Sequence, residues 1–386
     1  MKKNLIALAV FGAFSGAALA QSNVTLYGIV DVNYQYNDPD VSGASSTSGI
    51  NSGHQSGSRW GVRGSEALSP NLNAVFTLEG GMSVDDGTMG QGGRIFGRQA
   101  WGGLSGGWGT MVLGRVATFS SGTGSFDMFG SVDPFLTGFG DSSLGSTFNT
   151  AGAQRLDNSV LYQSPSWGGF KFGVGYSFNA SGQELGGSGN NNKVLFTGVS
   201  WGGGPFYVAA TYDQLDPAPL AGTATTVLIP GGASDQKQFQ IGATFDLKFL
   251  KLHGAYAKED HVYYTAGIGL QPDAGADADA WMVGVSVPLL GGSILASYQD
   301  RDGDAVNVVL GAAPTPTNQF NRERDRTVWG IAYTYPLSRR TNLYINYSDS
   351  DEEILSRNLV AGSPTTDIAR AGFDRRQYTV GIRHLF

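Results

Sequence analysis

The chain has 386 residues, of which 58 are glycine and only 15% are charged. It contains no cysteine, which excludes disulfides, thiolate metal sites and iron–sulfur clusters. A formal net charge of −7 argues against a nucleic-acid binder, and 11% aromatic residues exclude a largely disordered chain. A composition rich in glycine and aromatic residues instead suits many strands joined by turns.

The first twenty residues have the features of an export signal. Two lysines follow the initiating methionine, an apolar run covers 5–14, and an A-x-A cleavage site lies at 18–20. The apolar run is too short to anchor the chain as a spanning helix. We therefore expect residues 1–20 to be a signal peptide, cleaved after export through the Sec pathway, and residues 21–386 to form one domain.

Cleavage there would remove two lysines and leave a mature chain with a net charge of −9. No other stretch approaches the ~20 consecutive apolar residues that a membrane-spanning helix needs. Lipid satisfies no backbone hydrogen bonds, so a mature chain located in a membrane would have to form a closed β-barrel.

Apolar and polar residues alternate along many segments. In the first, Val24, Leu26 and Val30 share one face, and Thr25 and Asp31 lie on the other. The same period of two recurs over 170–178, 239–245, 281–287, 329–335 and 343–347. Each segment is close to the ~10 residues that a tilted strand needs to cross a bilayer. A soluble sandwich would also alternate, so this pattern alone leaves both architectures open.

The spacing of the expected strands separates the two. We expect about sixteen, over 23–36, 55–66, 72–83, 93–104, 108–116, 155–164, 169–179, 193–201, 205–213, 235–247, 249–258, 279–288, 292–300, 325–335, 341–350 and 375–386. Short turns alternate with long polar loops, which span 37–54, 84–92, 117–154, 180–192, 214–234, 259–278, 301–324 and 351–374. This rhythm predicts an all-β, transmembrane, antiparallel up-and-down barrel with both termini at the short-turn end.

A series of motifs runs in order through the mature chain, over 24–31, 58–66, 96–104, 113–115, 157–162 and 335–341, and ends at the terminal Phe386. Together they resemble the Gram-negative general porins of the β-proteobacterial type. The resemblance implies a homotrimer in the lipids of the outer membrane that lets ions and small hydrophilic solutes diffuse passively. It also implies that the third long loop, 117–154, folds into the lumen. The loop segment 133–141 and His384 depart from the family pattern.

Several arginines are expected to face that lumen. Trp60 and Val62 should contact lipid, which places Arg59 and Arg63 inside. An arginine facing lipid near the midplane would cost ~2–4 kcal/mol, which supports this orientation. The same parity argument directs Arg98 inward.

Two further arginines belong to the same group. Leu156 is expected on the outer face, which directs Arg155 and Asp157 inward. Arg115 shares the parity of the apolar residues around it, and a bulge at Gly114 would turn it inward. By resemblance to the porins it belongs to the inward cluster.

The predicted constriction sets these arginines against carboxylates of the infolded loop. Its members are Arg59, Arg63, Arg98, Arg115 and Arg155 on the wall and Asp127, Asp133 and Asp141 on the loop. Charges at a constriction control ion selectivity, whereas loop charges beyond a screening length of about 8 Å contribute little. The excess of arginines therefore predicts weak to moderate anion selectivity despite the acidic chain.

Signals for catalysis are weak. The G-x-S-x-G pattern at 103–107 lies between two expected strands and is interpreted as a hairpin turn, since a nucleophile elbow needs a strand followed by a helix. The four histidines lack a metal-ligand spacing, and the chain has no Walker motif. We expect no enzyme activity, no cofactor, no catalytic or metal-binding residues and no nucleic-acid partner.

Three alternatives to a general diffusion pore remain open from the sequence. One is a substrate-specific channel for small organic acids, which would need the same inward arginines. The others are an outer-membrane barrel enzyme and an adhesin with its binding residues in the long loops.

Overall fold

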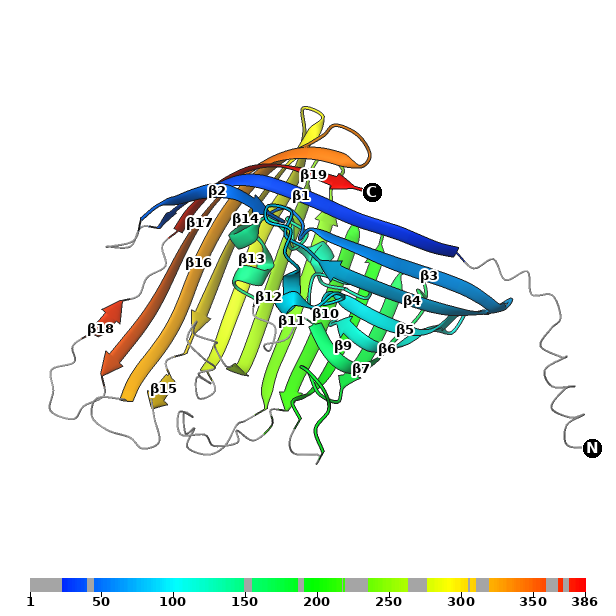
Figure 1. Ribbon diagram of the computed structural model, residues 1–386. Helices are drawn as coiled ribbons and strands as arrows, with labels where there is room; N and C mark the ends of the chain where they lie inside the picture. The colour runs from blue at the N-terminus through cyan, green and yellow to red at the C-terminus, as the bar shows by residue number, and fades with distance from the viewer. Residues whose placement is uncertain are drawn as a thin grey trace, which may run out of the picture.

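The computed structural model describes residues 23–39, 45–148, 155–186, 191–216, 218, 235–262, 276–304, 306–309, 319–358, 367–370 and 375–386. Within them, sixteen antiparallel strands close into one ring (Figure 1). They are β1 (Asn23–Pro39), β3 (Arg59–Ser69), β4 (Leu72–Gly81), β5 (Gln99–Gly106), β6 (Gly109–Ala117), β7 (Arg155–Gln163), β8 (Phe170–Ser177), β9 (Lys193–Gly203), β10 (Phe206–Asp216), β11 (Gln236–Asp246), β12 (Lys251–Val262), β13 (Ala276–Leu289), β14 (Gly292–Gly303), β16 (Gln319–Pro336), β17 (Thr341–Asn358) and β19 (Arg375–Leu385). The predicted sixteen-stranded barrel is confirmed.

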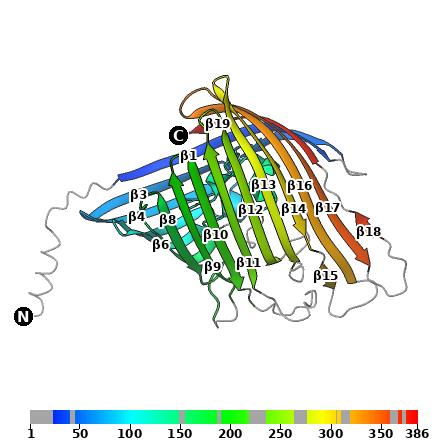
Figure 2. The same cartoon turned by 180° about the vertical axis from the view of Figure 1, so that it is seen from behind.

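Each strand pairs with its neighbour in the chain, and the first pairs with the last. β1 and β19 run together from Ile29 opposite Leu385 to Pro39 opposite Arg375. Two 3.1 Å backbone hydrogen bonds between Gly28 and Phe386 extend this seam. A ring closed in this way leaves no unpaired edge in lipid. Figure 2 shows the continuous wall on the far side.

The sheet continues further from the tight turns than the sequence predicted. β16 and β17 pair from Pro336 opposite Asn342 to Phe320 opposite Asn358, inside the expected loops 301–324 and 351–374. Three short strands, β2 (Thr47–Ser52), β15 (Val306–Val309) and β18 (Asp367–Arg370), also lie in expected loops and pair with β1, β16 and β17. Cross-strand hydrogen bonding needs no apolar face, so polar segments extend the sheet without leaving an alternation signal.

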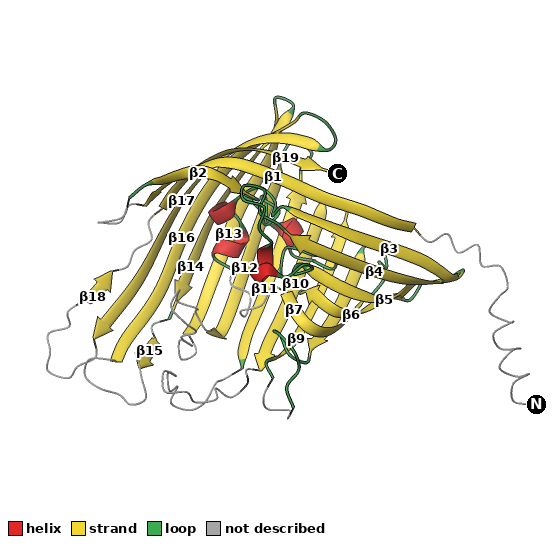
Figure 3. Cartoon of the chain, in the orientation of Figure 1, coloured by secondary structure: helices red, strands yellow, loops and turns green. Residues whose placement is uncertain are grey.

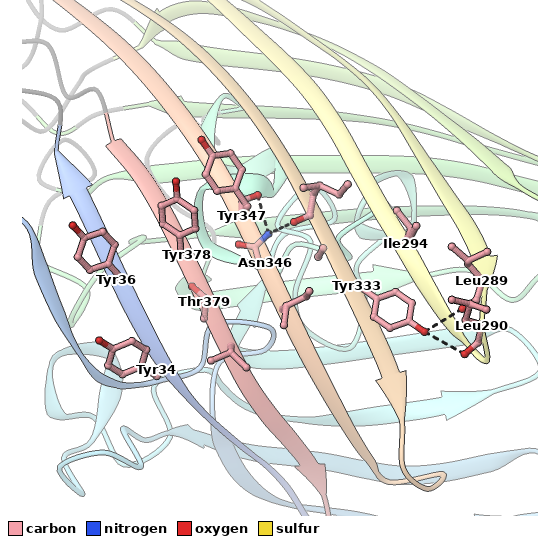
Figure 4. Close-up of a pocket in the computed structure, with 14 residues that line it drawn as sticks. Tyr34, Tyr36, Leu289, Leu290, Ile294, Tyr333, Asn346, Tyr347, Tyr378 and Thr379 are labelled. Carbon is pink, nitrogen blue, oxygen red and sulfur yellow. Dashed lines mark hydrogen bonds between the residues drawn. The ribbon is translucent and has the colours of Figure 1, made fainter.

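Large apolar side chains cover the outer face of the ring. Tyr36, Tyr378, Tyr347 and Trp329 form a row across β1, β19, β17 and β16, with ring centroids 4.8 to 6.1 Å apart. The row adjoins an apolar groove of about 600 Å³, at whose other end the Tyr333 hydroxyl donates to backbone carbonyls of the β13–β14 turn (Figure 4). Aromatic rows of this kind mark the interface between hydrocarbon and water in outer-membrane barrels.

The lumen contains the connection between β6 and β7. Residues 118–148 fold inward, and their three 3₁₀ turns, η1 (Gly130–Val132), η2 (Gly140–Ser142) and η3 (Leu144–Ser146), lie inside the ring (Figure 3). Outside this connection the described helical structure is α2 (Gly90–Gly93). No helix in the described part of the chain is long and apolar enough to cross a membrane.

Glycines on the inner face make room for this connection. A Cβ at Gly173 in β8 would lie 2.3 Å from the Phe119 ring, and one at Gly242 in β11 would lie 2.4 Å from Val132. Phe119 is fully buried against β8 and β9, and the Tyr207 hydroxyl of β10 donates to Met128 O at 2.5 Å. The predicted infolding of the third loop is confirmed, and the loop fills the lumen next to β8–β11.

One outer-face assignment was wrong. Leu156, expected to face lipid, is fully buried with Val112 and Val116 in an inner apolar cluster. The β6–β7 register shifts between Gly114 and Val116, and Asn158 has a φ of +48°. A bulge reverses the alternation of the residues beyond it. The outward assignment of Leu156 counted alternate residues back from Tyr162 and assumed a strand without a bulge.

Candidate functional site

A cavity of about 740 Å³ lies between the infolded loop and the barrel wall. Charged and titratable wall residues line it: Arg59 of β3, Arg98 just before β5, Lys251 and His253 of β12, and Arg383 of β19. The loop contributes Asp127 and Asp133 together with the segment from Pro134 to Thr137. The cavity thus brings together four of the eight predicted site residues.

Arg59 and Arg383 lie on either side of β1. Ile29 of β1 is opposite Arg59, and Asp31, two residues on, is opposite Arg383. The Arg59 side chain donates through Nε to Gly57 O at 2.8 Å, and this is its one side-chain hydrogen bond within the described residues. The Asp31 carboxylate instead accepts the Tyr344 hydroxyl and the Ser56 backbone N–H, both at 2.6 Å. Both guanidiniums therefore reach the cavity without a carboxylate bound to them.

Arg98 has the same inward orientation but a different partner. Its Nε lies 2.7 Å from Glu79 Oε1, and both side chains are buried. Glu79, from β4, also accepts the Tyr27 hydroxyl at 3.0 Å. The charge of Arg98 is therefore largely compensated, and Glu79 is a member of the site that was not predicted from the sequence.

Arg155 and Arg115 adjoin this group. Arg155 Nη2 donates to Thr123 Oγ1 of the loop at 3.1 Å, and its guanidinium interacts electrostatically with those of Arg59, Arg98 and Arg115. Arg115 lies where the β6–β7 register shifts, but the extra residue of this bulge is in β7, near Asn158, and β6 stays in register with β5 through Gly114 and Arg115. The bulge expected at Gly114 was therefore placed on the wrong strand. The Arg115 guanidinium contacts Asp157 at 2.5 Å, so this arginine is paired.

Arg63 lies away from the cavity. It is four residues nearer the tight turn than Arg59, is exposed, and stacks 5.2 Å above the centroid of the Tyr27 ring. The structure therefore separates Arg63 from the cluster of the other arginines.

The carboxylates of Asp127 and Asp133 bind backbone amides of their own loop. Asp133 is fully buried and accepts N–H groups of Phe135, Thr137 and Leu144 at 2.9 to 3.0 Å. Asp127 accepts those of Gly122 and Gly130 at 2.8 Å and of Phe129 at 3.3 Å. Burial raises the pKa of each carboxyl to about 6 although these hydrogen bonds favour the ionised form. Both aspartates shape the loop more directly than they face a solute.

Asp141 lies elsewhere in the lumen and connects the loop to the wall. Its carboxylate pairs with Arg326 of β16 at 3.3 Å and with Arg375 of β19, whose Nε donates at 2.9 Å. The cavity lining does not include it. The third predicted aspartate is thus separated from the arginines of β3 and β7.

Buried polar contacts fix the far part of the loop. Arg301 of β14 pairs with Glu259 of β12 at 2.6 Å and donates to Thr147 O at 2.9 Å. His253 Nδ1 lies 2.8 Å from Val132 O. The wall thus holds the loop at several points along its length.

Near the turn before β3, Phe139 N of the loop donates to His54 O at 2.6 Å, and the His54 ring lies 2.9 Å from Asn346 Oδ1. Burial lowers the pKa of His54, which therefore stays neutral at pH values where an exposed histidine would begin to take up a proton. This contact holds the loop on the side of the cavity that β1 and β3 form.

The features considered for catalysis have structural roles. The G-x-S-x-G segment forms the β5–β6 hairpin, and Ser105 Oγ lies 2.8 Å from Thr110 Oγ1 across it. Among the described residues no group of three or more histidine, aspartate or glutamate side chains is arranged to hold a metal ion. The hairpin interpretation of this motif is confirmed.

Sequence reasoning missed Arg383 and Lys251. Alternation in the last strand places Tyr378, Val380 and Ile382 outside and therefore Arg383 inside. The inward direction of Arg383 could thus be predicted from the sequence. The closeness of Arg383 to Arg59 could not be predicted from the sequence, because this closeness depends on the pairing of β1 with both β3 and β19.

Known proteins with related sequences are outer-membrane channels. A family model described as Gram-negative porin matches residues 7–354. An outer membrane porin protein of Bordetella pertussis is 36% identical over 89% of this chain and 93% of its own. Outer membrane porin protein 32 of Delftia acidovorans is 32% identical over the full length of both chains.

Solved structures agree with the barrel described above. An anion-selective porin from Comamonas acidovorans has a TM-score of 0.69 and 27% identity, and the alignment covers 95% of this chain and 100% of that one. The trimer form of the outer membrane protein OmpT from Vibrio cholerae has a TM-score of 0.60 and 16% identity, covering 95% of this chain and 99% of that one. The second likeness concerns the fold alone.

Proposed function

We propose that this chain, which belongs to the Gram-negative porin family and is an outer-membrane porin, conducts small anions in preference to cations. The observation that carries the proposal is the unequal pairing of charges around the cavity. Arg59 and Arg383 have no ion pair within the described residues, whereas Asp127 and Asp133 bind backbone amides. The similarity to the anion-selective porin of Comamonas acidovorans supports the same preference.

The physical reason is the short range of electrostatics in salt water. A fixed charge acts on a passing ion only within a screening length of about 8 Å. At a constriction every passing ion comes within that distance of the wall, whereas an exposed outer loop can lie further away. Arg59, Arg155 and Arg383 supply the positive potential at the cavity, and Arg98 adds to it less because of Glu79. We assign Arg63 and the Arg115–Asp157 pair to the approaches on either side of this point.

The test is the zero-current potential of the reconstituted pore in a potassium chloride gradient. Replacing Arg59 and Arg155 by glutamine should move this potential toward cation preference, because two positive charges leave the constriction. The matched control replaces Arg339 and Arg340, which are exposed in the β16–β17 turn, and should leave it unchanged. A wild-type pore that prefers potassium, or an Arg59/Arg155 variant that behaves like the control, would contradict the proposal.

The proposal also covers assembly and export. We infer a homotrimer embedded in outer-membrane lipid, a cleaved signal peptide over residues 1–20, which lie outside the described residues, and passive diffusion without cofactor or catalysis. The Vibrio cholerae relative with the same fold is described as a trimer form. The closed ring with an apolar outer face suits a trimer in lipid. In such a trimer each protomer would enclose its own pore.

A further inference from the structure

His384, which departs from the porin pattern, lies on the outer face of the barrel. It shares the parity of Tyr378, Val380 and Ile382 in β19 and is exposed as they are. Its Nδ1 lies 2.9 Å from Thr341 Oγ1 of the neighbouring β17, and its Nε2 has no hydrogen-bond partner within the described residues. A polar ring is therefore directed toward lipid at the tight-turn end of the last strand.

Two arginines lie in the β16–β17 turn next to this histidine. Arg339 and Arg340 are exposed, and neither guanidinium has a hydrogen bond or an ion pair in the part of the chain that the structure describes. Arg340 O accepts the Leu385 N–H at 2.8 Å, which fixes the turn directly beside the end of β19. Together these side chains form a basic rim (Arg339, Arg340 and His384) on the outer edge of the barrel.

The apolar groove on the outer face begins at the same end of the barrel. Its lining runs from Leu289 and Leu290 in the β13–β14 turn across the strands to Val380 and the aromatic row (Figure 4). The β13–β14 and β16–β17 hairpins lie side by side in Figures 1 and 2, and a Cβ at Gly291 would lie 3.6 Å from the Tyr335 ring. The groove thus extends from the neighbourhood of the basic rim into the hydrocarbon.

The position of this surface determines which ligands can reach it. Short turns of outer-membrane barrels face the periplasm, so the basic rim lies at the headgroups of the inner, phospholipid leaflet. A phosphate would accept hydrogen bonds from the arginines, whose planar donor groups suit its oxygens. An acyl chain would cover the exposed side chains of Ile345 and Val380 in the groove. A zwitterionic headgroup would also bring an ammonium group, which the arginines repel.

We infer that the basic rim and the groove together bind an anionic phospholipid of the inner leaflet, such as phosphatidylglycerol. The phosphate would contact Arg339, Arg340 and the free Nε2 of His384, and one acyl chain would lie in the groove. This lipid site is outside the pore and adds to the proposed conduction of anions without depending on it.

Native mass spectrometry of the intact mature porin in a neutral detergent tests this, with dioleoylphosphatidylglycerol and dioleoylphosphatidylcholine as probes. Phosphatidylglycerol should bind roughly thirtyfold more tightly, the ratio expected for two arginines near a lipid phosphate. Arg339→Gln combined with Arg340→Gln should bring its affinity to that of phosphatidylcholine. His384→Leu removes one hydrogen-bond donor and should reduce the ratio about fivefold. Glycerol 3-phosphate, which has no acyl chain, should not compete.

Two further variants separate the headgroup from the acyl chain. Lys171→Gln combined with Lys248→Gln removes two exposed charges at the same end of the barrel, next to other turns, and should keep the thirtyfold ratio. Val380→Trp would fill the groove with an indole ring and should weaken both lipids equally. The zero-current potential of the arginine variant should equal that of the wild type, which shows that a folded pore is measured.

Each contrary result has a distinct meaning. Equal affinities of the wild type for the two lipids, or an unchanged ratio in the arginine variant, would overturn the inference while leaving the proposed anion selectivity intact. Unchanged lipid affinity in Val380→Trp would overturn the role of the groove, and competition by glycerol 3-phosphate would indicate a phosphate site that needs no lipid. Variants that dissociate the oligomer would assign this surface to a second copy of the chain instead.

Discussion

At the residue scale, the partner of an arginine decides its contribution more than its orientation does. Arg59 and Arg98 both face the lumen, yet Arg98 is buried against Glu79 at 2.7 Å and Arg59 has no carboxylate bound to it. Arg115 is likewise paired with Asp157. A count of five arginines against three aspartates predicts the sign of the potential. It gives every charge the same weight, although some are compensated by a bound partner and others are not.

The loop carboxyls predict a pH dependence of selectivity. Burial raises the pKa of Asp127 and Asp133 from 3.8 to about 6, so both take up protons as the pH falls from about 8 to about 4. Loss of two negative charges should strengthen the anion preference, with a midpoint near pH 6. Because the folded state holds these protons more tightly than the unfolded chain, the loop should also become less stable as the pH rises through this range.

The measurement is the zero-current potential at several pH values. His253 lines the same cavity and would change the selectivity in the same direction on protonation, so His253→Gln is the control and should keep the transition near pH 6. A flat profile in both proteins, or a transition that disappears with His253, would show that the aspartates do not titrate there.

At the element scale, the infolded loop behaves as part of the wall. Its residues pack into spaces that Gly173 and Gly242 leave open, and β12 and β14 hold its far part through Glu259 and Arg301. Since the loop and the wall together enclose the cavity, the dimensions of the pore depend on contacts far from the arginines. A loop of this length without such contacts would not hold one conformation.

Removal of one buried anchor should widen the pore. Glu259→Gln removes the carboxylate that pairs with Arg301 at 2.6 Å, and losing one charge of a buried ion pair costs about 3–5 kcal/mol. We expect a lower unfolding temperature and faster entry of larger neutral sugars in liposome-swelling assays. Glu66→Gln, at an exposed position near the tight-turn end of β3, is the matched control. Unchanged sugar permeation in the Glu259 variant would mean that other contacts suffice to hold the loop.

At the scale of the whole molecule, closure of the ring depends on the two ends of the chain. β1 pairs with β3 along its first half and with β19 from Ile29 onward, and Phe386 reaches back to Gly28. No ring can form before the last strand is made, so the barrel completes only when the C-terminus is in place.

The mature protein should show this assembly directly. Protein extracted from outer membranes is expected to begin at Gln21, to give a β-sheet circular dichroism spectrum and to run on gels as a trimer that heat dissociates. Edman sequencing, spectroscopy and electrophoresis with and without boiling measure these properties. A periplasmic monomer that retains residues 1–20 would be incompatible with the assembly proposed here.

Much of the fold could be predicted from the sequence because the physics that determines it is local. The period of two in segments such as 170–178 fixes which side chains meet lipid, and the alternation of short and long connections fixes the up-and-down order. The infolding of the loop 117–154 was implied by the family resemblance and agreed with the length of this connection, and the structure bears it out for residues 118–148. The inward direction of Arg59 followed from the cost of a charge in hydrocarbon.

The tertiary structure decided what those inward residues touch. The pairing of β1 with two strands more than three hundred residues apart in the chain sets Arg59 beside Arg383, and the β7 bulge at Asn158 brings Leu156 into the interior. Parity gives only a direction, whereas ion pairing and burial depend on distances across the ring and from the loop to the wall. For that reason the sequence determined the barrel and the sign of its lining, and the compensation of Arg98 and the apolar groove on the outer face became visible only in the folded molecule.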